Sequence, residues 1–150
     1  MKHALLIIDV QNDFCPGGSL AVTDGDQIIS GINDIMNDFD YVILTQDWHP
    51  ANHSSFANNQ NADPFSVIDM PYGPQVLWPD HCIQGSFGSA LHESLNTIRA
   101  DLIIRKGQNP LVDSYSAFFE NDHTTATGLH GHLIERSVSK VTLEIGRAHV

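Results

Sequence analysis

The sequence predicts a three-layer α/β/α fold built on a mostly parallel sheet. Apolar runs typical of buried strands alternate along the chain with apolar residues at helical spacing, which is the order of an α/β protein. Three of the runs close on or just before a charged side chain. The length of 150 residues suits a single domain with its own core.

The first strand is predicted at 4–10, where "ALLIIDV" is apolar almost throughout, as in strands buried on both faces. A loop broken by Pro16, Gly17 and Gly18 follows. A helix is expected next, with Asp24 as its N-terminal cap. Its apolar residues recur at helical spacing: Ile28, Ile29, Ile32, Ile35, Met36 and Phe39.

"YVILT" at 41–45 is the second predicted strand, and "DLIIRKG" at 101–107 is the third. Between them, 46–88 is rich in Pro, Gly, Asn, Ser and His, and a loop of that length is unusual unless it is functional. A second helix is expected over 124–137, and "KVTL" at 140–143 begins a fourth strand.

Composition excludes several classes of partner and location. Seven basic residues stand against 18 acidic ones, so the basic patch of a nucleic-acid binder is missing. The chain lacks a run approaching the roughly 20 apolar residues of a membrane helix. Two cysteines, Cys15 and Cys82, are too few for a disulfide framework. We therefore expect a cytoplasmic protein without nucleic-acid or membrane partners, and its oligomeric state is open, a homo-oligomer included.

Charged residues follow the predicted strands at corresponding places. Asp9, Asp47 and Lys106 lie at or just past the ends of the first three strands. Because ligand sites in open α/β sheets lie beyond the carboxyl ends of the strands, we expect these side chains at one edge of the sheet. Asp9 would be a general base and Lys106 the cation that tunes it. Taken singly, a strand-end carboxylate and a surface lysine are also compatible with purely structural roles.

A metal site is predicted in the loop after the second strand. Asp47, His49 and His53 read D-x-H-x3-H, and His81 in "WPDHC" would be a fourth ligand. Carboxylate and imidazole ligands suit zinc, and also iron or manganese. His49 and His53 are four residues apart, so one helical turn could direct both at one ion. Surface histidines in a polar loop are the alternative.

Four segments together resemble the nicotinamidases, also called pyrazinamidases, of the isochorismatase-like cysteine hydrolase superfamily. These segments are "IIDVQNDFCPGGSL", "QDWHPANHSSF", "WPDHC" and "KGQNPLVDSYSAFF". The resemblance implies metal-assisted hydrolysis of nicotinamide, or of pyrazinamide-like amides, to the acid and ammonia in NAD salvage. It also implies an isochorismatase-like, Rossmann-like form of the predicted fold, incomplete at the C-terminus, and it assigns Asp9 and Lys106 to catalysis. It assigns the divalent metal to Asp47, His49, His53 and His81. It places Phe14, Trp78 and Tyr115 around the substrate ring.

The chain departs from that family at its end. The family's nucleophilic cysteine follows the fourth strand, but here "EIGRAHV" follows "KVTL", and neither Cys15 nor Cys82 aligns with the nucleophile. The codons GAG ATC GGA AGA GCA CAC GTC would encode this tail, and from the second base they match a common short-read sequencing adapter. We expect 1–143 to be the N-terminal part of one hydrolase domain, truncated at its C-terminus. We expect 144–150 to be a non-native tail and the 150-residue chain to be inactive.

Two alternatives remain open. The first is another isochorismatase-like hydrolase acting on a different small substrate, although many such relatives lack the metal ligands. The second is a catalytically dead homologue that only binds a metal or ligand.

Overall fold

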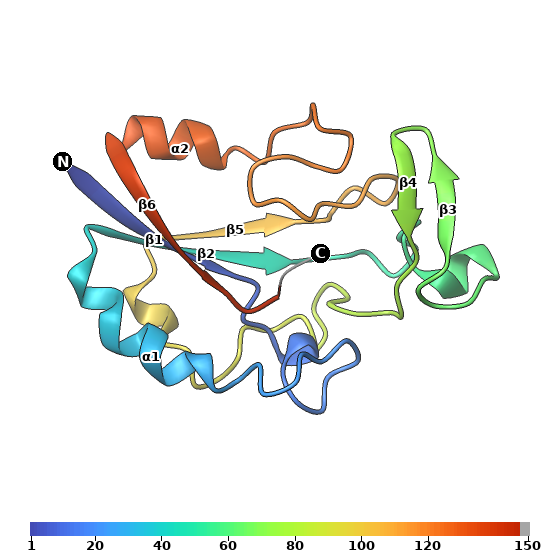
Figure 1. Cartoon of the computed structure of the whole chain (residues 1–150), viewed down its shortest axis with the longest axis horizontal. Coiled ribbons are helices and arrows are strands. Elements are labelled where there is room, and N and C mark those ends of the chain that lie inside the picture. The colour runs from blue at the N-terminus through green and yellow to red at the C-terminus, as the bar shows by residue number, and fades with distance from the viewer. Residues whose placement is uncertain (148–150) are drawn as a thin grey trace.

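The computed structural model describes residues 1–147. Its centre is a four-stranded sheet in the order β5-β2-β1-β6, in which every neighbouring pair is parallel. The strands are β1 (Lys2–Ile8), β2 (Tyr41–Asp47), β5 (Leu102–Lys106) and β6 (Val138–Ile145). Helix α1 (Ile28–Ile35) covers one face and α2 (Leu129–Glu135) covers the other (Figure 1). The predicted three-layer fold is therefore confirmed.

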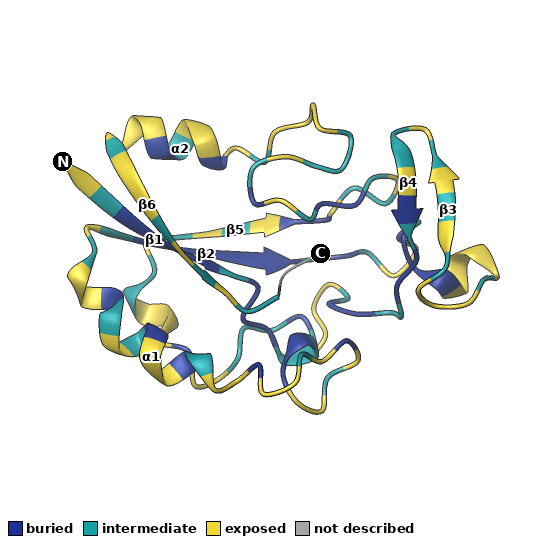
Figure 2. Cartoon of the chain, in the orientation of Figure 1, coloured by how far each residue is buried: buried dark blue, intermediate teal, exposed yellow. Residues whose placement is uncertain are grey.

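Burial on both faces explains the continuous apolar runs of the inner strands. In β1, Leu5 and Ile7 pack in a cluster with Ile29 and Ile32 of α1. The alternate residues of β1, including Leu6, pack on the opposite face in a cluster with α2. The inner strand β2 is buried over nearly its whole length (Figure 2). Each fully buried Leu or Ile contributes roughly 1.5–3 kcal/mol, so these two strands carry most of the core.

The helices are shorter than the sequence pattern indicates. The proposed cap Asp24 is wrong, because the residue before α1 is Gln27 and Asp24 has a left-handed backbone (φ 56°) within a turn. Helix α2 begins only after Gly128, whose φ of 98° ends the preceding loop. The backbone amides of Thr124 and Thr125 donate to the Asp122 carboxylate instead, which holds that segment in a turn.

The stretch 46–88 contains a hairpin that the sequence pattern did not reveal. Strands β3 (Val67–Met70) and β4 (Gly73–Val76) pair antiparallel as a separate two-stranded sheet. Each has four residues, and β4 contains a proline, so neither shows the alternation that identifies a strand.

Strand β6 forms an outer edge of the main sheet. It begins before the predicted 140–143 and continues through Glu144 and Ile145, which pair with Ile7 and Ile8 of β1. Backbone pairing is independent of side-chain identity, so the origin of 144–150 stays a prediction, and 148–150 lie outside the described residues.

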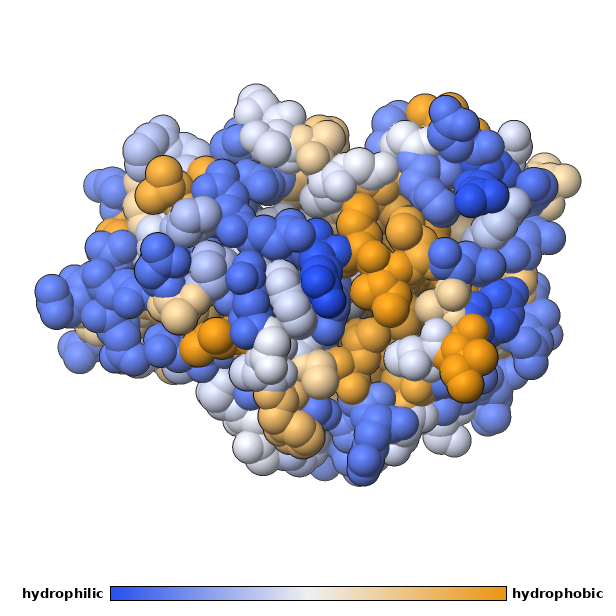
Figure 3. Space-filling model, turned by 180° about the vertical axis from the view of Figure 1, so that it is seen from behind, coloured by the Kyte–Doolittle hydropathy of each residue, from blue (hydrophilic) through white to orange (hydrophobic). Residues whose placement is uncertain are grey.

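Apolar side chains also reach the surface. On the face opposite to that of Figure 1, they gather in a band between polar areas (Figure 3). On β6, Leu143 is 52% exposed and Ile145 is 48% exposed. Within the described residues, the helices are all too short or too polar to cross a membrane.

Candidate active site

The carboxyl ends of three neighbouring parallel strands bring Asp9, Asp47 and Lys106 together. Asp47 and Lys106 are register partners in β2 and β5, and Asp9 follows the last residue of β1. The Lys106 Nζ atom lies 2.8 Å from Asp9 Oδ2 and 3.2 Å from Asp47 Oδ1. All three side chains are buried. One ammonium therefore bridges two carboxylates that lie far apart in sequence.

The two carboxyl groups differ in acidity. Burial raises the pKa of Asp9, and the neighbouring Lys106 offsets only part of that rise. Burial also acts to raise the pKa of Asp47, but His49 and Lys106 outweigh it and hold that pKa well below its usual range. Pairs of groups whose environments separate their pKa values in this way commonly divide the roles of an active site. Asp47 is thus suited to bind a cation, and Asp9 is the stronger base.

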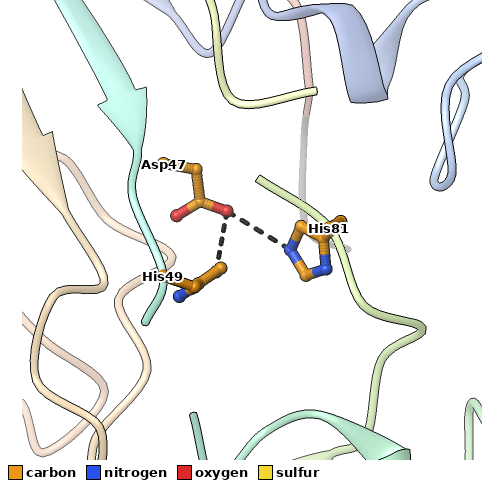
Figure 4. A group of neighbouring side chains, drawn as sticks. All are labelled: Asp47, His49 and His81. Atoms are coloured by element: carbon orange, nitrogen blue, oxygen red, sulfur yellow. Dashed lines mark hydrogen bonds and ion pairs between the residues drawn. The ribbon is translucent and has the colours of Figure 1, made fainter. Parts of the chain in front are cut away.

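Asp47 also lies between two imidazoles (Figure 4). Its Oδ2 atom is 3.0 Å from His49 Nε2 and 3.4 Å from His81 Nε2. Ligand atoms around a tetrahedral zinc ion lie about 3.4 Å apart, because each is about 2.0–2.1 Å from the metal. The three donors, contributed by Asp47, His49 and His81, are therefore spaced as ligands of one ion would be.

The tautomers of these two rings also fit a metal. The His49 Nδ1 donates to the Gly107 carbonyl at 2.9 Å, and the His81 Nδ1 donates to the Pro79 carbonyl at 2.8 Å. A neutral ring fixed in this way keeps the Nε2 lone pair for the metal, as in most histidine ligands. Within residues 1–147, the His81 Nε2 is buried and makes no hydrogen bond, although Asp47 Oδ2 lies 3.4 Å away. Such an atom is costly to bury unless something binds it.

His49 is the ligand most affected by its surroundings. Burial acts to lower its pKa, but Asp47 outweighs this and raises the pKa to about 9. Without a cation the ring therefore holds a second proton on Nε2, which a metal ion would displace. The adjacent Gly107 has a left-handed φ of 73°, and a Cβ there would lie 2.5 Å from His49 Cε1. A glycine is needed at this position for the ring to fit.

His53, the fourth ligand predicted from the sequence, takes a different place. It groups with His49 and Asp113 rather than with Asp47 and His81. The segment is a turn closed by the bond from His53 N to Pro50 O, so the expected helical turn does not form. Burial, and then the nearby His49, lower the pKa of His53 to about 4. Its Nε2 is buried and has no hydrogen-bond partner in the described part of the chain, so a ligand role is still compatible with its geometry.

Two residues of the site were missed in the sequence. Asp113 is buried, and its Oδ1 is 3.9 Å from His49 Nε2. Gln11 donates to the Asp47 carbonyl at 2.9 Å and accepts from the Asp47 amide at 2.8 Å, which fixes the backbone of that ligand. Gln11 lies in the segment "DVQNDF" and Asp113 in "DSYSAFF". The residues that they contact are distant in sequence, so neither segment alone indicates these roles.

The buried charges of the site do not balance without a cation. Asp9, Asp47 and Asp113 supply three carboxylates, against the Lys106 ammonium and, when no metal is bound, the doubly protonated ring of His49. One negative charge then remains. Buried charges are tolerated when they are paired or coordinate a metal. A divalent ion that displaces the second proton of His49 would bring two positive charges in place of one and cancel it. Charge balance and donor spacing thus both support a divalent metal.

The predicted aromatic residues lie beside the metal ligands. Phe14 and Trp78 are buried in one cluster, with Tyr115 packed against it. The ring of Phe14 is 5.7 Å from that of His81, and Trp78 and Tyr115 meet edge to face at 6.1 Å. An apolar aromatic wall next to a polar centre is typical of a small-molecule site.

Neither cysteine of the chain is suited to attack a substrate. Burial raises the pKa of Cys82, and Asp47 raises it further, so the thiolate is disfavoured. Burial also raises the pKa of Cys15. Both thiols are free and buried. Reactive cysteines normally have a lowered pKa, so the structure gives no support to either as a nucleophile.

A model of the Isochorismatase domain matches residues 3–143. The chain belongs to the isochorismatase family. It is 55% identical over 139 residues to the nicotinamidase of Acinetobacter baylyi, covering 92% of this chain and 65% of that protein. The chain therefore spans just under two thirds of the length of this family member.

Solved structures of other family members have the same fold. An Acinetobacter baumanii nicotinamidase pyrazinamidase superposes with a TM-score of 0.92 at 55% identity, covering 95% of this chain and 69% of that one. A pyrazinamidase of Pyrococcus horikoshii in complex with zinc gives a TM-score of 0.69 at 29% identity, with coverages of 97% and 70%.

Proposed function

We propose that the protein is a nicotinamidase, which hydrolyses nicotinamide to nicotinate and ammonia. The observation that carries this proposal is the joint placement of the Asp47, His49 and His81 donors, the Asp9–Lys106 pair and the aromatic wall. The names of the similar family members support the same substrate class. Pyrazinamide-like amides, which also carry a carboxamide on a flat six-membered aromatic ring with nitrogen, are proposed as further substrates.

The proposed metal is divalent, with zinc first and iron or manganese as alternatives. Asp47, His49 and His81 would hold it, and His53 is a further proposed ligand from beside His49. Imidazole and carboxylate donors suit all three metals. The zinc bound by the Pyrococcus horikoshii relative supports zinc. When bound, such an ion would orient the substrate by its ring nitrogen.

The chain's own residues supply proton transfer and ring binding. Asp9 is the proposed base, because burial raises the pKa of its carboxyl and Thr45 holds it through a 2.6 Å bond to Oδ1. Lys106 stabilises negative charge between Asp9 and Asp47. Phe14, Trp78 and Tyr115 are the proposed ring contacts. An amide is a poor electrophile, so hydrolysis also needs a strong nucleophile.

We propose that this nucleophile is absent from the 150-residue chain. The family resemblance places it after β6, and the raised pKa values of Cys15 and Cys82 disfavour both as substitutes. We therefore propose that residues 1–143 carry the metal and ring sites and that 144–150 are non-native. The 150-residue chain would bind metal without turning over amide. The raised pKa values of Cys15 and Cys82 also favour a second candidate function, in which the protein is a binding homologue that never had a catalytic nucleophile.

The cellular setting follows from the same chemistry. Nicotinate is a precursor for pyridine nucleotides, so we propose a role in NAD salvage. A cytoplasmic location is proposed because both cysteines are free. The partner is a small molecule, and a homo-oligomer is compatible with this function.

One experiment separates the candidates. The source DNA is sequenced beyond codon 143, and the complete product and the 150-residue chain are both assayed with zinc for ammonia release from nicotinamide. We expect turnover by the complete product and none above background by the 150-residue chain. A genomic stop codon directly after Val150 would favour the binding homologue. Turnover of a different amide, with nicotinamide inert, would favour another hydrolase of the family.

A further inference from the structure

A buried glutamine lies behind the aromatic wall. Gln75 belongs to β4, at the edge of the molecule, yet only 1% of its surface is exposed (Figure 1). Its neighbours in the hairpin are mostly half-buried or exposed. A buried amide has to satisfy two donors and an acceptor oxygen with two lone pairs, and it is costly when it does not.

Every hydrogen-bonding position of this amide is used. The Gln75 Nε2 donates to the Tyr115 hydroxyl at 2.6 Å and to the Val76 carbonyl at 2.7 Å. The Gln75 Oε1 accepts from the Tyr72 hydroxyl at 3.0 Å and from Asn121 Nδ2 at 3.1 Å. The side chain thus joins the hairpin to the loop that carries Tyr115.

The same network fixes both ends of Tyr115. Its backbone amide donates to Asn121 Oδ1 at 3.0 Å, and its hydroxyl oxygen accepts from Trp78 Nε1 at 3.1 Å as well as from Gln75. The Tyr115 hydroxyl thus links Trp78 to Gln75, so its position affects the angle and spacing of the two rings.

Space also adjoins Tyr115. The residue lines two cavities of about 350 Å³ each, one beside Leu6 and Ile8 and the other beside Tyr72 and Asn121. Where packing leaves space, hydrogen bonds such as those to the Tyr115 hydroxyl restrict a side chain further.

We propose that Gln75 is a positioning residue that sets the spacing of Trp78 and Tyr115 and thereby the affinity for a flat aromatic amide. The inference rests on the proposed function, because it takes these two rings as the wall that holds the substrate ring. Gln75 itself touches neither the metal ligands nor the Asp9–Lys106 pair among its hydrogen bonds. Its effect should fall on ring binding and leave metal binding unchanged.

The test is calorimetric titration of the zinc-loaded 150-residue chain with nicotinamide. Gln75→Leu keeps the approximate size but removes the amide, and we expect it to raise the Kd at least about fivefold. In Gln75→Glu, burial favours the protonated acid, which can donate to the Val76 carbonyl and accept from Tyr72, Asn121 and the Tyr115 hydroxyl. It should therefore restore a Kd within about twofold of the parent. Zinc affinity should be unchanged in both variants. Gln60→Leu, at an exposed glutamine, is the matched control.

A second measurement follows the ring directly. The chain has two tryptophans, so in a Trp48→Phe background the emission reports Trp78 alone. We expect Gln75→Leu to shift that emission and Gln75→Glu to leave it near the parent value. If Gln75→Leu does not fold, Tyr72→Phe serves instead, because it removes one bond to the Gln75 Oε1, and it should raise the Kd by a smaller factor.

The outcomes separate the inference from the proposed function. If the parent chain binds nicotinamide and Gln75→Leu binds it with the same Kd, the role of Gln75 is overturned and the proposed function is not. Where Gln75→Leu does not fold, the same Kd in Tyr72→Phe has that meaning. A parent chain that takes up zinc but does not bind nicotinamide would overturn the proposed ring site, and the role of Gln75 with it. A weaker Kd in Gln75→Leu that Gln75→Glu does not rescue would indicate general loosening and would also overturn positioning through the Tyr115 hydroxyl.

Discussion

Two regions of the main sheet differ in the side chains that they bury. The carboxyl ends of β1, β2 and β5 bury charged side chains, whereas the outer strand β6 exposes apolar ones. At the strand ends, charged groups such as Asp47 and Lys106 are 2% exposed. On β6, the apolar Leu143 and Ile145 are about half exposed. In the first region, buried ion pairs between side chains add to the backbone pairing of the strands, whereas Leu143 and Ile145 are held in place by the backbone pairing of β6 with β1. Changes at the strand ends should therefore alter stability and binding, whereas changes on β6 should alter association.

The largest expected effect is the loss of the buried ammonium. Lys106→Met leaves Asp9 and Asp47 buried without their shared counter-charge, and we expect the free energy of unfolding to fall by about 3–5 kcal/mol. Urea denaturation measures this. The matched control Lys140→Met, at an exposed position on β6, should change it by less than about 0.5 kcal/mol. Equal effects of the two substitutions would contradict the contrast between the regions.

Zinc should stabilise the strand-end region strongly. At a free zinc concentration of 100 times the Kd, binding adds about 2.7 kcal/mol, which corresponds to a rise in Tm of roughly 5–10 °C for a chain of this size. His81→Ala removes a buried donor and should abolish most of that rise in a thermal melt. His130→Ala, at an exposed histidine, should retain it. A rise that persists in His81→Ala would place the ion elsewhere.

Gln11 should have an intermediate effect on the same region. Gln11→Ala leaves the buried Asp47 amide without an acceptor, so we expect a loss of about 1–3 kcal/mol in unfolding free energy and weaker zinc binding. Gln60→Ala is the control, because its single bond to the Ser54 carbonyl lies at the surface. Unchanged zinc affinity in Gln11→Ala would show that the Asp47 backbone does not need this support.

The smallest effect on stability is expected on β6. Exposed apolar side chains on an edge strand favour association, so Leu143→Lys with Ile145→Lys should reduce self-association of the chain. Sedimentation velocity measures this, and the unfolding free energy should change by less than about 1 kcal/mol. Ile134→Lys, at an exposed position on α2, is the control. A parent chain that is monomeric at high concentration would contradict the prediction.

The sequence predicted the site best at the carboxyl ends of the strands, where the charged residues lie. Buried parallel strands have a strong signature, and their register follows from the fold, so the meeting of Asp9, Asp47 and Lys106 could be predicted. The hairpin β3–β4 could not, because four-residue strands with a proline resemble a loop. Asp113 and Gln11 were missed because their roles depend on contacts 36 or more residues away.

The placement of His53 shows the limit of spacing arguments. Two histidines four residues apart share a helical face, but the segment forms a turn after Pro50, and His53 groups with Asp113. The ligands that meet at Asp47 come from two loops, at 49 and at 81, and only the folded chain brings them together.

The most direct test of the account is the position of the metal. Crystals of the chain grown with zinc are measured at the zinc absorption edge. We predict one strong anomalous peak within about 2.2 Å of Asp47 Oδ2, His49 Nε2 and His81 Nε2. A zinc-saturated crystal with no peak there, or with its peak at the exposed histidines, would contradict the claim that these strand ends form a metal site.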